Sequence, residues 1–230
     1  QAEDGIRDVE RSRGLGDVYK RQALFLNPYR EWIGAQIRGD LWGYISPGDA
    51  ESAAEYAYRD ARLSHTKNGI YGELYSATLV ALAYAIEDAE KLVERAVKVV
   101  PARSRLAEAI VRTLKLFREG CSWEEAIKVI YSSYGSYHPV HTINNAAIVT
   151  AALLWGEGDF EKSIQYAVLG GLDTDCNGAT VGSVLGVMLG ASRLPSEWVK
   201  PLNDRVASAL SGLSELRITA LAEKTASLIE

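Results

Sequence analysis

Two aspartates, Asp173 and Asp175, lie one residue apart in the segment GGLDTDCNGATVGSVLG at 170–186. In an extended turn both carboxylates can point to the same side, where they repel each other unless a cation neutralises them. Hard divalent cations such as Mg²⁺ and Mn²⁺ take oxygen ligands of this kind. Two aspartates before a helix can also cap its free amides, and the spacing alone leaves both interpretations open.

A calcium loop is a third interpretation, because DTDCNG matches the first six positions of an EF-hand loop. The twelfth position of such a loop supplies a bidentate glutamate, and here that position is Val184. The segment is therefore not predicted to be an EF-hand. A zinc site at His138 and His141 is also disfavoured, because Pro139 lies between them and no third ligand is near in the sequence.

The residues after the aspartates predict a helix that positions them. Glycines recur every fourth residue, which places them along one side of a helix over about 177–191 and leaves Asp173 and Asp175 in the preceding loop. Glycine costs about 1 kcal/mol relative to alanine in a helix interior. Close approach by another helix or a ligand would explain such a face, and tight packing of a core helix is the interpretation that we favour; the members of the face are Gly178, Gly182, Gly186 and Gly190.

Hydrophobic spacing, capping residues and glycine stops predict further helices along the chain. The expected helices cover 50–63, 102–120, 122–135, 143–158 and 159–171. The stretch 73–100, ended by Pro101, forms one long helix or two consecutive ones. We expect an all-α fold, a compact orthogonal multi-helix domain over 23–230 that is truncated at its N-terminus.

Composition limits the partners. The chain carries a formal charge of −5, so nucleic acid and anionic membranes are not expected to bind it, and a small molecule or protein is the expected partner. Cys121 and Cys176 lie far apart in the sequence, which favours reduced thiols and a cytoplasmic setting. No apolar run reaches the roughly 18 residues of a spanning helix.

Residues 1–22 differ from the rest of the chain. They carry five acidic and five basic side chains with only scattered apolar ones, so no face is available for burial. They also resemble the translated adapter sequence found at the ends of sequencing reads. We expect a non-native or disordered tail here, with the true start of the protein lying upstream.

The aspartate segment with its flanks, GDFEKSIQYAVLGGLDTDCNGATVGSVLGVMLGA, resembles the C-terminal metal motif of the ADP-ribosylglycohydrolase family. The resemblance extends over residues 27 to about 205 through GAQIRGDLWGYISPGD, YRDARLSHTKNGIYGE and HTINNAAIVTAALLWGEGDF. It implies an all-helical hydrolase that uses two Mg²⁺ or Mn²⁺ ions to cleave the bond between ADP-ribose and an amino-acid side chain or related group. The expected partner is therefore an ADP-ribosylated protein or an ADP-ribose-containing small molecule.

The resemblance also assigns site residues. The metal ligands in the family's Asp-x-Asp-Thr turn correspond to Asp173 and Asp175, and Cys176 stands in place of the threonine. A thiol is a poor partner for Mg²⁺, so either Cys176 is not a ligand or the metal preference differs. The residues expected to line the substrate cleft are Gly34, Ala35, Arg38, Ser64, His65, Gly69, Tyr71 and Gly72. A structural ion pair at Arg38 and a backbone-satisfied loop histidine at His65 remain alternatives.

Two family motifs are missing from the 230 residues: an early Gly-Asp segment carrying a glutamate, and a Thr-Asp-Asp motif. They bring the other metal ligands and the base, so the catalytic residue is unassigned. We expect weak metal affinity and little turnover from this chain. A non-catalytic helical binding or structural protein that retains the fold is the alternative function. A nucleotide-sugar transferase with a DxD motif would require parallel strands, which the helical pattern disfavours.

Overall fold

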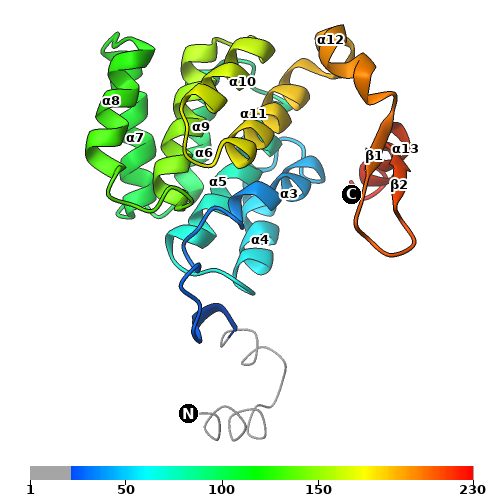
Figure 1. Ribbon diagram of the computed structural model, residues 1–230, viewed down its shortest axis with the longest axis horizontal. Helices are drawn as coiled ribbons and strands as arrows, with labels where there is room; N and C mark the ends of the chain where they lie inside the picture. The colour runs from blue at the N-terminus through cyan, green and yellow to red at the C-terminus, as the bar shows by residue number, and fades with distance from the viewer. Residues whose placement is uncertain (1–21, 230) are drawn as a thin grey trace, which may run out of the picture.

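The computed structural model describes residues 22–229, and their helices assemble into one body (Figure 1). The all-α prediction is confirmed for these residues, apart from one short hairpin. The predicted tail at 1–22 lies, except for residue 22, outside the described residues. In chain order the elements are η1 (Gln36–Arg38), α3 (Asp40–Tyr44), α4 (Ala50–Ala61), α5 (Asn68–Ala83), α6 (Ala89–Ala96), η2 (Val97–Val99), α7 (Arg105–Arg118), α8 (Trp123–Tyr134), α9 (Thr142–Gly156), α10 (Phe160–Leu169), α11 (Thr174–Leu189), η3 (Ala191–Arg193), α12 (Ser196–Val199), η4 (Lys200–Leu202), β1 (Arg205–Ala207), β2 (Glu215–Arg217) and α13 (Ile218–Ala226).

Side chains that the sequence suggested as caps start several helices. Asp49 caps α4 and Asp159 caps α10, each by accepting hydrogen bonds from main-chain amides of the first turn. A full capping box starts α8: the Glu125 amide donates to Ser122 Oγ at 3.2 Å, and the Ser122 amide donates to the Glu125 carboxylate at 2.8 Å. These contacts explain why the predicted starts of these helices agree with the structure.

The predicted stretch 73–100 consists of two helices. The break lies before α6, where Asp88 accepts a hydrogen bond from the Lys91 amide at 2.9 Å and so starts the second helix. The first helix, α5, begins at Asn68, five residues earlier than expected. The predicted start at residue 73 is therefore wrong, because helical backbone extends through both Gly69 and Gly72.

Helices α5 and α9 form the core. Nearly every residue of α9 is buried, as its unbroken apolar sequence predicts, and α9 packs against α5, α7, α8, α10 and α11. The two core helices are joined by a buried hydrogen bond of 2.9 Å between the hydroxyls of Tyr75 and Thr150. Both helices begin on the side of the molecule where the candidate site lies, so a rigid core holds their first turns in place.

The glycine face of α11 does not meet the backbone of another helix, so that part of the expectation is wrong, and the approach of a ligand stays a prediction. A methyl group added at Gly178 or Gly182 would meet only side-chain carbons, 3.9 and 3.8 Å away, and one added at Gly186 would meet nothing within 4 Å. Instead, Gly182, Gly186 and Gly190 line a cavity of about 560 Å³. Gly190 has a positive φ of 72° at the end of the helix, where glycine is favoured.

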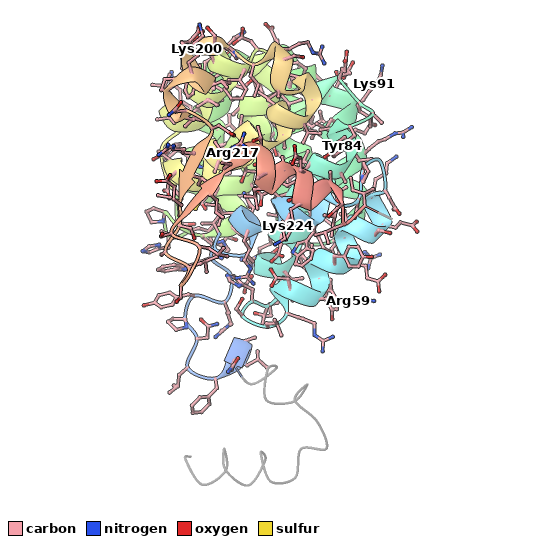
Figure 2. All side chains as sticks on the ribbon, turned by 90° about the vertical axis from the view of Figure 1, so that its right-hand side faces the viewer. Arg59, Tyr84, Lys91, Lys200, Arg217 and Lys224 are labelled. Atoms are coloured by element: carbon pink, nitrogen blue, oxygen red, sulfur yellow. The ribbon has the colours of Figure 1, made fainter. Side chains whose placement is uncertain are left out.

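The C-terminal segment forms one wall of this cavity. Strands β1 and β2 form an antiparallel hairpin that leads into α13, and α13 lies across this side of the helical body beside Tyr84 (Figure 2). Ile218 and Leu221 of this helix and Ile229 after its end line the cavity, although each of these residues remains more than a third exposed. Within residues 22–229 no helix is both long and apolar enough to cross a membrane.

Candidate metal and substrate site

The aspartate turn stands at the start of α11. The helix begins at Thr174, so Asp175 lies in its first turn and only Asp173 precedes it, which corrects the prediction that both aspartates lie in a loop. Asp173 occupies the capping position, but its carboxylate makes no capping hydrogen bond. Asp173 therefore does not form the capping bond that the alternative requires, and Cys176 is a hydrogen-bonding neighbour of its carboxylate.

Asp173, Asp175 and Cys176 form one cluster. One ligand atom from each lies within 4.8 Å of the others, with Asp173 half-buried, Asp175 exposed and Cys176 buried. Burial, together with the neighbouring Asp175 carboxylate, raises the pKa of Asp173 above its usual range. Burial and the two aspartates raise the pKa of the Cys176 thiol to about 12, so the thiol is neutral in the metal-free protein.

Asn145 of α9 holds this turn in place. Its side-chain oxygen accepts hydrogen bonds from the Asp173 amide at 3.0 Å and from Asn177 Nδ2 at 2.9 Å. Its side-chain nitrogen donates to the carbonyls of Pro139 and His141 at 2.7 and 2.8 Å. One fully buried amide therefore connects the start of α11 to the turn before α9.

A pocket of about 390 Å³ adjoins the cluster, and four segments of the chain line it, one of them the turn before α9 with Val140. Asp173 and Cys176 come from the start of α11, Ser64 and His65 from the loop after α4, and Gly34 from the segment before η1. These five residues are among those that the sequence singled out, and the structure brings them together. The remaining lining residues are Asn27, Tyr29, Trp32, Ile33 and Val140.

Backbone hydrogen bonds hold the segment 27–34 in place. The Ile33 amide donates to the Val140 carbonyl at 2.9 Å, and the Thr66 amide donates to the Arg30 carbonyl at 2.9 Å. The segment thus lies between the turn before α9 and the loop before α5. Trp32 stacks on the imidazole of His138, with ring centroids 4.5 Å apart, which gives this end of the pocket an aromatic wall.

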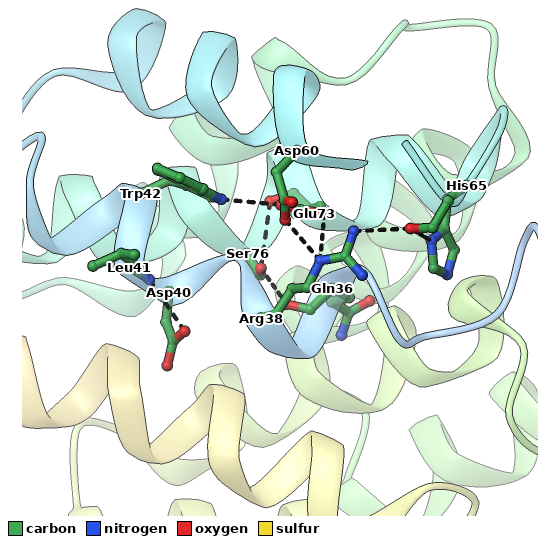
Figure 3. A network of polar contacts seen from close by, with 10 residues as sticks. Gln36, Arg38, Asp40, Leu41, Trp42, Asp60, His65, Glu73 and Ser76 are labelled. Carbon is green, nitrogen blue, oxygen red and sulfur yellow. Dashed lines mark hydrogen bonds and ion pairs between the residues drawn. The ribbon is translucent and has the colours of Figure 1, made fainter. Parts of the chain in front are cut away.

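Arg38 lies behind the pocket in a polar network (Figure 3). Its Nε donates to Asp60 at 2.7 Å, and one Glu73 oxygen lies 3.8 Å from the same nitrogen. Trp42 Nε1 donates to the other Glu73 oxygen at 3.2 Å. Arg38 therefore forms a structural ion pair with Asp60, which was the alternative interpretation of this residue. It is not among the residues that line the pocket.

Glu73 and Asp60 divide one proton and one charge between them. Burial, and then the neighbouring Asp60 carboxylate, raise the pKa of Glu73 to about 9. For Asp60 burial acts in the same direction, but hydrogen bonds from Glu73 and Arg38 outweigh it and lower the pKa of this carboxyl. At neutral pH Glu73 is therefore protonated, and Asp60 carries the charge that pairs with Arg38.

Several predicted substrate residues lie away from the pocket. Ala35 is fully buried, and Gly69 and Gly72 are buried in the first turns of α5. A methyl group at Gly69 would lie 2.5 Å from the Arg30 carbonyl oxygen, so this glycine serves close packing of the segment 27–34 on α5. Tyr71 packs against the hydrophobic core.

Sequence reasoning missed three kinds of residue at the site. The aromatic wall has a visible signal in NPYREW, where two aromatic residues precede the glycine of GAQIR. Asn145 also has one, because two adjacent amides interrupt an otherwise apolar helix. The pairing of Asp60 with Glu73 has none, since the two residues belong to different helices and meet only in the fold.

The donor set fits a divalent cation in part. Two carboxylates within 4.8 Å of each other, neither used for capping, suit Mg²⁺ or Mn²⁺. A neutral thiol does not suit Mg²⁺, so Cys176 is not counted among its ligands.

A family model named ADP-ribosylglycohydrolase matches residues 9–229. The chain belongs to the ADP-ribosylglycohydrolase family. A sequence search of curated proteins finds no match. Membership of the ADP-ribosylglycohydrolase family makes the chain a hydrolase of ADP-ribosyl linkages at family level, and family members are generally metal-dependent. The match begins inside the segment 1–22 and continues through α13, so it extends beyond both ends of the sequence resemblance.

Proposed function

We propose that this protein is a metal-dependent hydrolase that releases ADP-ribose from modified side chains or from a related small molecule, and that the pocket of about 390 Å³ binds the ADP-ribosyl group. The single observation that carries the proposal is that the predicted metal-binding and substrate-binding residues meet at one pocket. Residues from three distant segments, expected to serve metal and substrate separately, line one pocket.

Asp173 and Asp175 would hold the cation, which is Mg²⁺ or Mn²⁺ in this proposal. A bound divalent ion supplies positive charge that orients sugar hydroxyls and lowers the pKa of bound water. The chain's own contribution is to place Asp173 at the pocket wall with Asp175 next to it. The hydrogen bond from the Asp173 amide to Asn145 keeps them there at 3.0 Å.

The pocket walls favour a ligand with a planar ring. Tyr29 and Trp32 have ring centroids 4.3 Å apart, and most of the remaining wall is apolar. Aromatic faces bind planar nucleobases by stacking. This feature supports a ligand that carries adenine beside its ribose.

The test measures ADP-ribose release from peptides carrying ADP-ribosylated arginine or serine, with Mg²⁺ or Mn²⁺ present. We expect slow, metal-dependent release, because the 230 residues contain no Thr-Asp-Asp motif that would add ligands. Asp173→Asn and Asp175→Asn should each remove it. Glu124→Gln, which changes an exposed carboxylate in the first turn of α8, is the matched control and should retain it.

Release that persists in both aspartate variants would disprove the assignment of the metal ligands. ADP-ribose binding with no release under any metal condition would favour the non-catalytic binding protein. Robust release by the wild-type chain would contradict the expected impairment and require a base elsewhere in the sequence.

A further inference from the structure

Arg38 fixes the direction of a short hydrogen-bond chain that ends in the pocket. While its Nε donates to Asp60, its Nη2 donates to Ser64 Oγ at 2.9 Å (Figure 3). A guanidinium has five N–H donors and no acceptor, so Ser64 Oγ must accept this bond. The serine hydroxyl proton is then available for another partner.

That partner is the neighbouring histidine. Ser64 Oγ lies 2.8 Å from His65 Nδ1, and among the residues that the structure describes no other acceptor lies within hydrogen-bonding distance of this hydroxyl. The hydroxyl is satisfied when it donates to Nδ1. A positive charge donating to the oxygen strengthens that bond further. Nδ1 therefore carries no proton, and a neutral imidazole must carry its proton on Nε2.

The Nε2 edge of His65 lies on the pocket side of the ring. A methyl group added at Gly34 would lie 3.7 Å from Nε2, and both residues line the pocket that Asp173 adjoins. Within residues 22–229, no protein group hydrogen-bonds Nε2. Burial and the charge of Arg38 lower the pKa of His65 to about 4, so the ring is neutral at physiological pH.

We propose that Arg38 and Ser64 are positioning residues that hold His65 as the Nε2–H tautomer, so that the pocket presents a fixed neutral donor to an oxygen acceptor of the ligand. The tautomer follows from the protein alone. The identity of the ligand rests on the proposed function, under which the acceptor is a hydroxyl or phosphate oxygen of the ADP-ribosyl group.

Imidazole ¹⁵N NMR on the wild-type chain tests the tautomer directly. The chain has three histidines, and the other two provide internal references. His138 Nδ1 and His141 Nδ1 each accept a main-chain amide at 3.2 Å, so both rings are expected to be Nε2–H. The signals that disappear from the spectrum of His65→Gln are those of His65. We expect His65 to match the two references, and a protonated Nδ1 in the wild-type spectrum would overturn the proposal.

Ser64→Ala tests whether the hydrogen-bond chain sets the tautomer. The His65 nitrogen signals should move towards the average of the two tautomers, and ADP-ribose affinity should fall about tenfold, as expected for one misdirected hydrogen bond. Ser132→Ala, an exposed serine on α8, is the control and should change neither. Unchanged His65 signals in folded Ser64→Ala would overturn the positioning role. If Ser64→Ala does not fold, the wild-type spectrum still shows whether His65 is the Nε2–H tautomer.

Titration with ADP-ribose and with AMP identifies the acceptor. A shift of His65 Nε2 with ADP-ribose alone assigns it to the distal ribose half, and a shift with both assigns it to the shared half; either result supports the proposal. If calorimetry shows that ADP-ribose binds and Nε2 does not shift, the proposal is overturned while the proposed function stands. If ADP-ribose does not bind, the proposed function fails and the wild-type tautomer still decides this inference.

Discussion

At the residue scale, Glu73 is a buried acid that holds its proton. No part of its side chain is exposed, and as a carboxylate its Oε2 would have no hydrogen-bond donor among the described residues. Arg38 lies 3.8 Å from it but is already engaged by Asp60. Since one cation serves two carboxyl groups, protonation of the more buried one relieves both the repulsion and the cost of burial.

This proton makes stability depend on pH. The pKa of Glu73 rises from 4.5 in the unfolded chain to about 9 in the folded protein, so its contribution is full below pH 4.5 and is lost as pH rises towards 9. Each pH unit in that window removes up to about 1.4 kcal/mol. Glu73→Gln keeps the shape without the proton, so its stability relative to wild type should increase from pH 5.5 to pH 8 in urea unfolding.

Glu124→Gln is the matched control for Glu73→Gln, because Glu124 is exposed at the start of α8. Its stability relative to wild type should stay constant over the same pH range. Parallel pH profiles for wild type and Glu73→Gln would show that Glu73 is ionised in the folded protein and would contradict the shared-proton arrangement.

At the element scale, the start of α11 depends on α9 through one side chain. Asn145→Ala leaves the Asp173 amide and the carbonyls of Pro139 and His141 without their partner. Unsatisfied buried groups are costly, so we expect a loss of about 2 to 4 kcal/mol in the free energy of unfolding. Gln165→Ala removes an exposed amide that donates only to Glu161 and should change stability by less than about 0.5 kcal/mol. Equal effects in denaturant titrations would show that Asn145 does not hold the turn.

Two glycines on different helices should respond in opposite ways to alanine. Gly186 of α11 faces the cavity under α13 with nothing within 4 Å of an added methyl group, so Gly186→Ala should stabilise the protein by about 0.5 to 1 kcal/mol. Gly69 of α5 packs on the Arg30 carbonyl, so Gly69→Ala should destabilise it by about 1 to 3 kcal/mol. Thermal unfolding measures both variants. A destabilising Gly186→Ala would mean that another chain segment packs on the glycine face.

The start of a helix was predictable wherever a capping side chain in the local sequence marks it. Asp49, Ser122 and Asp159 are caps that act within one turn, and the helices they start agree with the sequence. The start of α5 at Asn68 has no such signal: Lys67 precedes it with a positive φ of 48° and no capping side chain. Contacts from elsewhere set that boundary, including the hydrogen bond of 2.8 Å that Asn68 donates to Glu31.

The site was predictable where its residues form a short motif. Asp173 and Asp175 stand one residue apart, so their convergence follows from local backbone geometry. The expected close approach of another helix backbone to the glycine face was wrong, because spacing shows that a helix face is small without showing what lies opposite. The network of Arg38, Asp60 and Glu73 draws on three separate elements, and only the fold brings these residues together.

At the scale of the whole molecule, the candidate site is the meeting point of segments separated by more than a hundred residues. The core helices α5 and α9 provide the rigid frame. The segment 27–34 is hydrogen-bonded to the turn before α9, and the start of α11 is connected to the same turn through Asn145 of α9. This arrangement places the aromatic wall, His65 and Asp173 around one pocket, with Asp175 next to Asp173. A cation at Asp173 and Asp175 would therefore lie beside whatever ligand the pocket holds.

Paramagnetic broadening by Mn²⁺ in amide NMR spectra tests this account most directly, because it locates even a weakly bound ion. The account predicts that small additions of Mn²⁺ first broaden the signals of residues 171–177 and His65. The effect should be absent in Asp173→Asn and Asp175→Asn and should persist in Glu124→Gln. Broadening that begins elsewhere, or that is unchanged in both aspartate variants, would contradict a shared cation site at the start of α11.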